Sequence, residues 1–124
     1  MAVSVNIEKN FRDFSLKVQF EGSSAAIGLL GASGSGKSMT LRCIAGIETP
    51  DRGKIVINGK TVFDSEAGIN LKPQKRRIGY LFQNYALFPT MTVEQNIRCG
   101  YRGEKSSAQE KVSDLIRRYH LEGL

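Results

Sequence analysis

Gly31, Gly36, Lys37 and Ser38 are the residues of this chain whose types and spacing most clearly suggest chemistry. They form the pattern Gly-x-x-x-x-Gly-Lys-Ser within the stretch IGLLGASGSGKSMT. A phosphate group needs several backbone N–H donors aimed at one point, and a backbone that wraps so closely leaves no room for side chains, hence the glycines. The pattern therefore predicts a loop that holds phosphate.

The polar side chains at the end of this loop have predicted roles. Lys37 is expected to reach the β- and γ-phosphates of a nucleotide, and the Ser38 hydroxyl is a suitable hard ligand for the accompanying Mg²⁺. A helix that begins here would add unpaired N–H groups and roughly half a positive charge. After Lys37 the apolar residues recur at helical spacing, and Gly46 and Pro50 mark the predicted end of that helix.

The elements on either side must position the loop. The segment AAIGLL (25–30) directly before it is apolar throughout, which predicts a strand covered on both faces. Segments 3–7 and 14–20 alternate as an antiparallel pair does. Asn58-Gly59 lies between two β-prone runs and predicts a type I′ hairpin. The order of buried strand, glycine-rich loop and helix predicts an α/β fold.

The second half of the chain contains a further predicted strand and two predicted helix starts. RIGYLFQ (77–83) is a short apolar strand that ends at Gln83, whose amide is placed to reach the metal or its water. Residues 92–95 have the form of a capping box, and residues 107–110 repeat it. The apolar residues that follow lie on one face of a helix expected to run to about His120.

Composition sets broad limits. The chain has 124 residues, 40% of them hydrophobic, and no segment approaches the ~18 apolar residues of a membrane span. The N-terminus lacks the pattern of a secretory signal, so the cytoplasm is the expected compartment and Cys43 and Cys99 are expected to be free thiols. The net charge of +6 is densest in KPQKRR (72–77), which we interpret as a solvated rim beside a phosphate site. Contact with nucleic acid or anionic lipid is the alternative, but no aromatic-interleaved basic stripe supports a nucleic-acid partner.

Taken together, these features resemble the ATP-binding subunits of ABC transporters, in the importer branch. The motifs Asn-Lys-x-Asp and Asp-x-x-Gly of GTPases are not found, which favours ATP. In the ABC family the phosphate loop (Walker A) is followed by the Q-loop glutamine, and Lys37 and Gln83 match these positions. GIETPDRGKIVINGK (46–60) and LFPTMTVEQNI (87–97) are also similar to that family. The stretch SEAGINLKPQKRRIGYLFQ (65–83) is most similar to ATPases of molybdate, tungstate or sulfate importers.

The resemblance implies half of a P-loop ATPase domain. Its expected parts are an antiparallel N-terminal sheet, a parallel core strand and the Walker A helix, with a nucleotide-binding core at 1–83 and the start of the helical subdomain at 84–124. The residues expected to bind the nucleotide are Gly31, Ala32, Ser33, Gly34, Ser35, Gly36, Lys37, Ser38, Met39, Gln83 and Phe11, and Ser38 and Gln83 are expected to hold Mg²⁺.

Two of these residues need comment. Phe11 is expected to stack on the adenine, and Phe14 is its competitor for that role. Met39 stands where the family often has a threonine whose hydroxyl helps hold the α-phosphate, so Met39 offers only its backbone N–H and the affinity for nucleotide is expected to be somewhat lower.

The resemblance also implies cofactors, partners and a limit on activity. ATP and Mg²⁺ are the expected cofactors. A second ATPase subunit and membrane permease subunits are the expected partners, the latter through Tyr85 to Pro89, at the inner face of the cell membrane. The family's signature Leu-Ser-Gly-Gly-Gln, its acidic Walker B strand with the catalytic glutamate, and its switch histidine do not occur in this sequence. No catalytic residue is therefore expected in this chain, and hydrolysis is expected of a full-length parent only.

Two other functions remain open at this level. One is the N-terminal lobe of a chromosome-maintenance or DNA-repair ABC ATPase, in which a coiled coil separates two half-domains. The Leu-Phe-Pro segment at 87–89 and the short predicted helices argue against it. The other is a non-catalytic module that binds nucleotide and responds to it.

Overall fold

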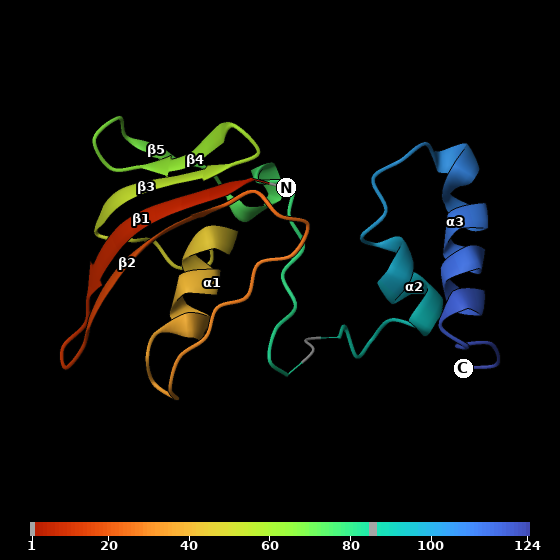
Figure 1. Cartoon of the computed structure of the whole chain (residues 1–124). Helices are drawn as coiled ribbons and strands as arrows, with labels where there is room; N and C mark the ends of the chain where they lie inside the picture. The colour runs from red at the N-terminus through yellow and green to blue at the C-terminus, as the bar shows by residue number, and fades with distance from the viewer. Residues whose placement is uncertain (1, 85–86) are drawn as a thin grey trace. The chain divides into compact units, whose positions relative to one another are not determined.

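The computed structural model describes residues 2–84 and 87–124 and divides the chain into two compact units (Figure 1). The first unit is Met1–Tyr80 and the second is Leu81–Leu124. The first contains a β-sheet, the phosphate-loop candidate and its helix, and the second contains two helices. Each unit is described by itself below.

The first unit is built on a five-stranded antiparallel sheet. Its strands are β1 (Val3–Asn10), β2 (Ser15–Gly22), β3 (Arg52–Ile57), β4 (Lys60–Asp64) and β5 (Ile69–Asn70), in the spatial order β2-β1-β3-β4-β5. The predicted pairing of the first two alternating segments is confirmed, with Val3 opposite Gly22. The buried core consists of Val5, Ile7, Leu16, Cys43, Ile55, Ile57, Val62 and Phe63.

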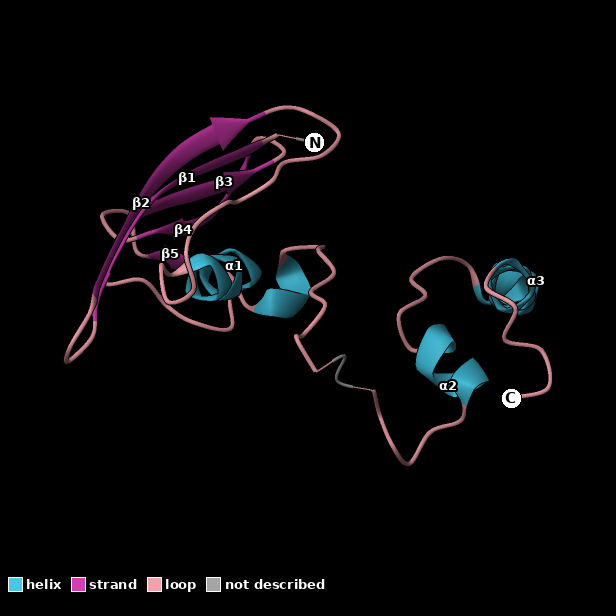
Figure 2. Ribbon diagram, turned by 60° about the horizontal axis from the view of Figure 1, so that its bottom comes forward, coloured by secondary structure: helices cyan, strands magenta, loops and turns pink. Residues whose placement is uncertain are grey.

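The predicted hairpin and the predicted helix of the first unit are confirmed. Asn58 (φ 50°) and Gly59 (φ 79°) connect β3 to β4 with the two positive φ angles that a type I′ turn requires. Helix α1 (Lys37–Ala45) ends at Gly46, as its sequence signals indicate. Figure 2 shows this helix on one face of the sheet, and its residue Cys43 belongs to the buried core.

Two predicted strands are wrong. Neither 25–30 nor 77–83 forms a strand, and the sheet of the described residues contains no parallel pair. An apolar run becomes a strand only where another backbone offers the matching row of donors and acceptors, and no described segment pairs with either run. The parallel core strand is therefore missing, whereas the α/β class with an antiparallel N-terminal sheet and a Walker A helix is confirmed.

The second unit contains α2 (Val93–Arg98) and α3 (Lys105–Arg118). The capping box of α2 is confirmed, because Gln95 N–H donates to Thr92 Oγ1 (3.1 Å) and Thr92 N–H donates to Gln95 Oε1 (2.9 Å). The box predicted at 107–110 is wrong: α3 begins three residues earlier than this box requires, with Glu104 as its N-cap. Ser107 N–H already donates to the Glu104 carbonyl (3.0 Å), so Ser107 lies inside the helix.

Three further properties bear on the sequence-based expectations. Helix α3 ends at Arg118, slightly before the predicted His120. Cys43 is buried and Cys99 is exposed, and both are free thiols as predicted. Among the residues that the structure describes, no helix combines the length and the apolar character needed to cross a bilayer.

Candidate functional site

The predicted phosphate loop leads directly into α1. Gly34 and Gly36 have φ angles of 80° and 96°, in the left-handed region that side chains disfavour. Gly36 is also the N-cap of α1, and a Cβ at this position would lie 2.5 Å from Leu16 Cδ1. The last glycine of the motif is therefore required both by its backbone conformation and by close packing against the start of β2.

The N-terminus of α1 is open to an anion. No side chain caps it, and no acidic residue stands in its first turn. The first four N–H groups of a helix lack intrahelical partners and carry the positive end of its dipole. Thr40 stabilises this end of the helix, because its N–H (2.9 Å) and its hydroxyl (2.8 Å) both donate to the carbonyl of the N-cap residue Gly36.

The Lys37 ammonium group folds back over the loop. It donates to the carbonyls of Gly31 (2.5 Å) and Ala32 (2.9 Å) and lies 3.4 Å from Ser35 Oγ. None of the ion pairs among the described residues involves Lys37. A positive charge is thus held against the loop by neutral acceptors, and an incoming phosphate would be a stronger partner for it.

The structure gathers the expected residues 31–39 in one place. Ser38 is exposed in the first turn of α1, whereas Met39 is half-buried and packs against the core. Gln83 is exposed and belongs to the second unit, so the expectation that Ser38 and Gln83 share Mg²⁺ stays a prediction.

The two aromatic candidates lie next to each other. The ring centroids of Phe11 and Phe14 are 6.0 Å apart with an interplanar angle of 27°. Phe11 is half-buried against the core, and the Lys9 ammonium lies 5.4 Å from its ring centroid. Phe14 is 40% exposed and is the ring beside the loop, since a Cβ at Gly36 would lie 3.3 Å from its Cζ. Phe14 thus borders the phosphate loop, and Phe11 stacks on Phe14.

The basic run 72–77 is only partly the predicted solvated rim. Lys72, Lys75 and Arg77 are exposed, but Arg76 is buried, with 4% of its surface accessible. Nothing in the sequence KPQKRR distinguishes Arg76 from its neighbours, because the burial of Arg76 depends on its contact with α1. This residue was missed by the sequence analysis.

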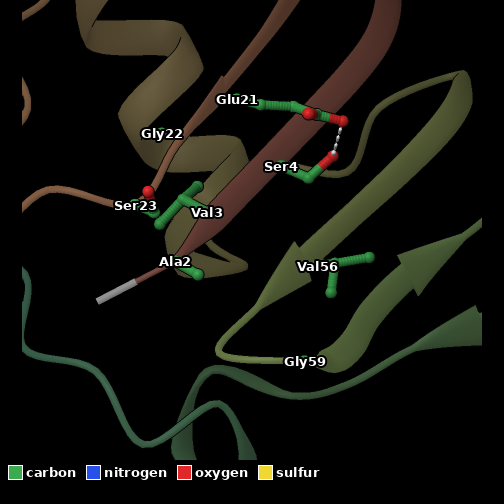
Figure 3. A pocket seen from close by; sticks show the side chains of 8 residues that line it. All are labelled: Ala2, Val3, Ser4, Glu21, Gly22, Ser23, Val56 and Gly59. Carbon is green, nitrogen blue, oxygen red and sulfur yellow. Dashed lines mark hydrogen bonds between the residues drawn. The ribbon is translucent and has the colours of Figure 1, made fainter.

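A separate hollow of about 550 Å³ lies in the first unit, where β1, β2 and the β3–β4 hairpin meet (Figure 3). Ser4 and Glu21 point toward each other at its edge, with Ser4 Oγ donating to Glu21 Oε1 (3.5 Å). Residues 31–39 and the Phe11–Phe14 pair do not line it. The hollow is therefore distinct from the candidate phosphate site.

The segment expected to face a permease is organised by one side chain of α2. Asn96 Oδ1 accepts a hydrogen bond from Phe88 N–H (2.9 Å), and its amide nitrogen donates to the carbonyls of Met91 (3.3 Å) and Thr92 (2.9 Å). Leu87 and Phe88 remain 73% and 53% exposed. Tyr85, predicted for the same surface, lies outside the described residues together with residue 86.

Comparison with known proteins gives the family. The profile of the ABC transporter family matches residues 11–124. The molybdate/tungstate import ATP-binding protein WtpC of Methanocaldococcus jannaschii is 47% identical over 114 residues, which are 89% of this chain and 36% of that protein. The molybdenum import ATP-binding protein ModC of Paramagnetospirillum magneticum is 34% identical over 118 residues, 92% of this chain and 32% of that protein. This chain belongs to the ABC transporter family, and the resemblance inferred from its motifs is confirmed.

Other relatives carry other cargo names. The sulfate/thiosulfate import ATP-binding protein CysA of Synechocystis is 42% identical over 96% of this chain and 34% of that protein. The Fe(3+) ions import ATP-binding protein FbpC 2 of Pectobacterium atrosepticum is 44% identical over 76% of this chain and 27% of that protein. The chain thus spans about a third of the length of these relatives.

A solved structure supports the fold. The dimeric structure of MJ0796, a bacterial ABC transporter cassette, matches 99% of this chain and 59% of its own chain with a TM-score of 0.65. A second structure of MJ0796, in a post-hydrolysis state bound to ADP and Pi, matches with a TM-score of 0.63. The sequence identity in both cases is 21%, so these likenesses concern the fold alone.

Proposed function

We propose that this chain is the nucleotide-binding part of an ABC importer ATPase and that residues 31–39 hold the phosphates of Mg-ATP. The observation that carries the proposal is the open N-terminus of α1. Two positive-φ glycines precede it, and the Lys37 ammonium contacts the neutral carbonyls of the same loop. Such an end offers N–H donors, a dipole and a cation to one anion.

Magnesium fits the residues that are present. Mg²⁺ takes hard oxygen ligands, keeps several waters and is bound largely through the phosphates that it accompanies. The exposed hydroxyl of Ser38 stands in the first turn, beside the proposed phosphate position, and supplies one such oxygen. When bound, the ion would neutralise phosphate charge, and Gln83 is proposed to reach it or its water.

The adenine is proposed to stack on Phe11, with Phe14 as the competing ring. The substitutions Phe11→Ala and Phe14→Ala separate them, because only the stacking ring should change the preference for ATP over inorganic triphosphate. Isothermal titration with both ligands measures that preference.

The proposed cargo of the parent transporter is an oxyanion of the molybdate, tungstate or sulfate type. The names of three relatives support this class, and the stretch 65–83 is most similar to such ATPases. A similar N-terminal sequence also occurs in a relative named for Fe(3+) import.

The proposed partners are permease subunits and a second ATPase subunit. The side chains of Leu87 and Phe88 are exposed, and Asn96 is hydrogen-bonded to the Phe88 backbone. These features support an apolar contact with a permease at the cytoplasmic face of the membrane. The parent would hydrolyse ATP, whereas this chain is expected to bind it without turnover.

Calorimetric titration with Mg-ATP tests the proposal. Lys37→Ala is expected to weaken binding by about 1.5–3 kcal/mol, because it removes a charged hydrogen-bond partner of phosphate. The control Lys60→Ala removes an exposed lysine at the β3–β4 hairpin and should leave the affinity unchanged. Equal affinities of wild type and Lys37→Ala would show that the loop is not the site.

A further inference from the structure

The C-terminal end of α1 is held by one buried side chain. The Arg76 guanidinium donates through Nη1 to the carbonyls of Cys43 (2.9 Å) and Ile44 (3.0 Å), both in the last turn of α1. Its Nε donates to the Leu71 carbonyl (2.9 Å), and its Nη2 donates to Asn70 Oδ1 (3.0 Å). Arg76 thus connects the end of the helix to the segment that follows β5.

No carboxylate balances this charge among the described residues, since none of their ion pairs includes Arg76. The last carbonyls of a helix lack intrahelical partners and carry the negative end of its dipole. The carbonyls of Cys43 and Ile44 therefore take the place of a carboxylate partner for Arg76. Burial lowers the pKa of the Arg76 guanidinium, but an arginine stays charged at neutral pH.

Gly46 leaves space for the Arg76 guanidinium because it has no side chain. It follows α1 with a φ of 85°, and a Cβ at this position would lie 2.8 Å from Arg76 Nε and 2.9 Å from its Cζ. The glycine therefore both ends the helix and admits the guanidinium beside the final carbonyls. Gly46 and Arg76, which are distant in the sequence, thus pack directly against each other.

Helix α1 connects the Arg76 contact to the nucleotide site. The helix has nine residues with a rise of about 1.5 Å each, so it is short and behaves as a rigid rod. Its other end presents the first-turn N–H groups and Ser38. Fixing the rod at its C-terminus therefore fixes the direction in which those donors point, and donor placement sets the strength of an anion contact.

We propose that Arg76 is a positioning residue of the nucleotide site, which clamps the C-terminal end of α1 and thereby aligns the phosphate-binding end. The proposal rests on the proposed function of the loop. A lysine is a poor substitute, because a point charge on a flexible stem cannot span two helix carbonyls and two further acceptors in fixed directions.

The test uses the 124-residue chain with the variants Arg76→Met and Arg76→Lys. The control Ile7→Val removes one carbon from a side chain of the buried core and should destabilise the same unit, while Ile7 takes part in none of the hydrogen bonds of Arg76. Two properties are measured: amide hydrogen exchange at Thr40 and Leu41 without nucleotide, and the affinity for Mg-ATP.

We expect Arg76→Met to exchange these amides faster than Ile7→Val does and to bind Mg-ATP about tenfold more weakly. We expect Arg76→Lys to recover only part of both losses. Exchange or affinity equal to that of Ile7→Val would overturn the positioning role and leave the proposed function intact. If wild type itself did not bind Mg-ATP, the proposed function would fail, and unchanged exchange in the same experiment would overturn the clamp separately.

Discussion

The antiparallel sheet and the segment 25–38 use apolar sequence in opposite ways. In the sheet, strands pair with their neighbours and bury Ile7, Ile55 and other side chains completely. In the segment, no regular pairing forms, and Leu30 is 99% exposed. The sheet thus supplies the stability of the first unit, whereas the segment contains the backbone donors that we propose for a ligand.

The largest expected effect contrasts two apolar residues across this divide. Ile55→Ala should lower the free energy of unfolding by about 2–5 kcal/mol, since it opens a cavity in the sheet core. Leu30→Ala should stay within about 0.5 kcal/mol of wild type, because the side chain is solvated. Urea denaturation measures both, and an equal loss in the two variants would break the comparison.

Lys37 in the loop is expected to matter for nucleotide binding and not for the stability of the free chain. Lys37→Ala should leave the free energy of unfolding without nucleotide within about 0.5 kcal/mol of wild type. It should nevertheless remove most of the stabilisation that saturating Mg-ATP gives the wild type. Thermal unfolding with and without Mg-ATP measures this difference, and full nucleotide stabilisation of the variant would contradict the assignment.

Thr40 lies where the two regions meet. Thr40→Val keeps the shape of this buried side chain but removes the hydrogen bond from its hydroxyl to the Gly36 carbonyl. A loss of about 1 kcal/mol in stability is expected, with a smaller loss of Mg-ATP affinity. Denaturation and titration of the same variant report the two effects, and a change in neither would show that this bond does not support the loop.

The smallest effect concerns the outer surface of the sheet. A hydrogen bond and the charge of Arg52, with a lesser effect of Lys17, hold the pKa of Glu8 below its usual 4.5. A lowered pKa in the folded state means that this stabilisation is present above the usual pKa and is lost as the pH falls through the lower folded value. Glu8→Gln should therefore be less stable than wild type at pH 7, with the gap closing on acidification. A gap that stays constant in urea melts between pH 7 and pH 3 would contradict this origin.

Local signals in the sequence predicted local structure correctly. The glycine pattern before α1, the Asn58-Gly59 turn and the capping box at Thr92 each depend on neighbouring residues only, and the structure contains the helix, the turn and the cap. The box at 107–110 failed because the same local pattern can occur inside a helix that has already begun at Lys105.

The features that depend on distant residues were not predictable in the same way. The runs 25–30 and 77–83 have the composition of buried strands, but composition cannot supply the pairing partner that a strand needs. The burial of Arg76 depends on the carbonyls of α1, which are far away in the sequence and leave no trace in the run KPQKRR.

The most direct test of the central claim is a titration of the ¹⁵N-labelled chain with Mg-ATP, followed through its backbone amide signals. We expect the largest shifts at the amides of residues 34–39, at the N-terminus of α1, and we expect Lys37→Ala to abolish them at the same ligand concentration. Shifts concentrated elsewhere, for example around Ser4 and Glu21 in the hollow of Figure 3, would contradict the claim that this loop holds the phosphates.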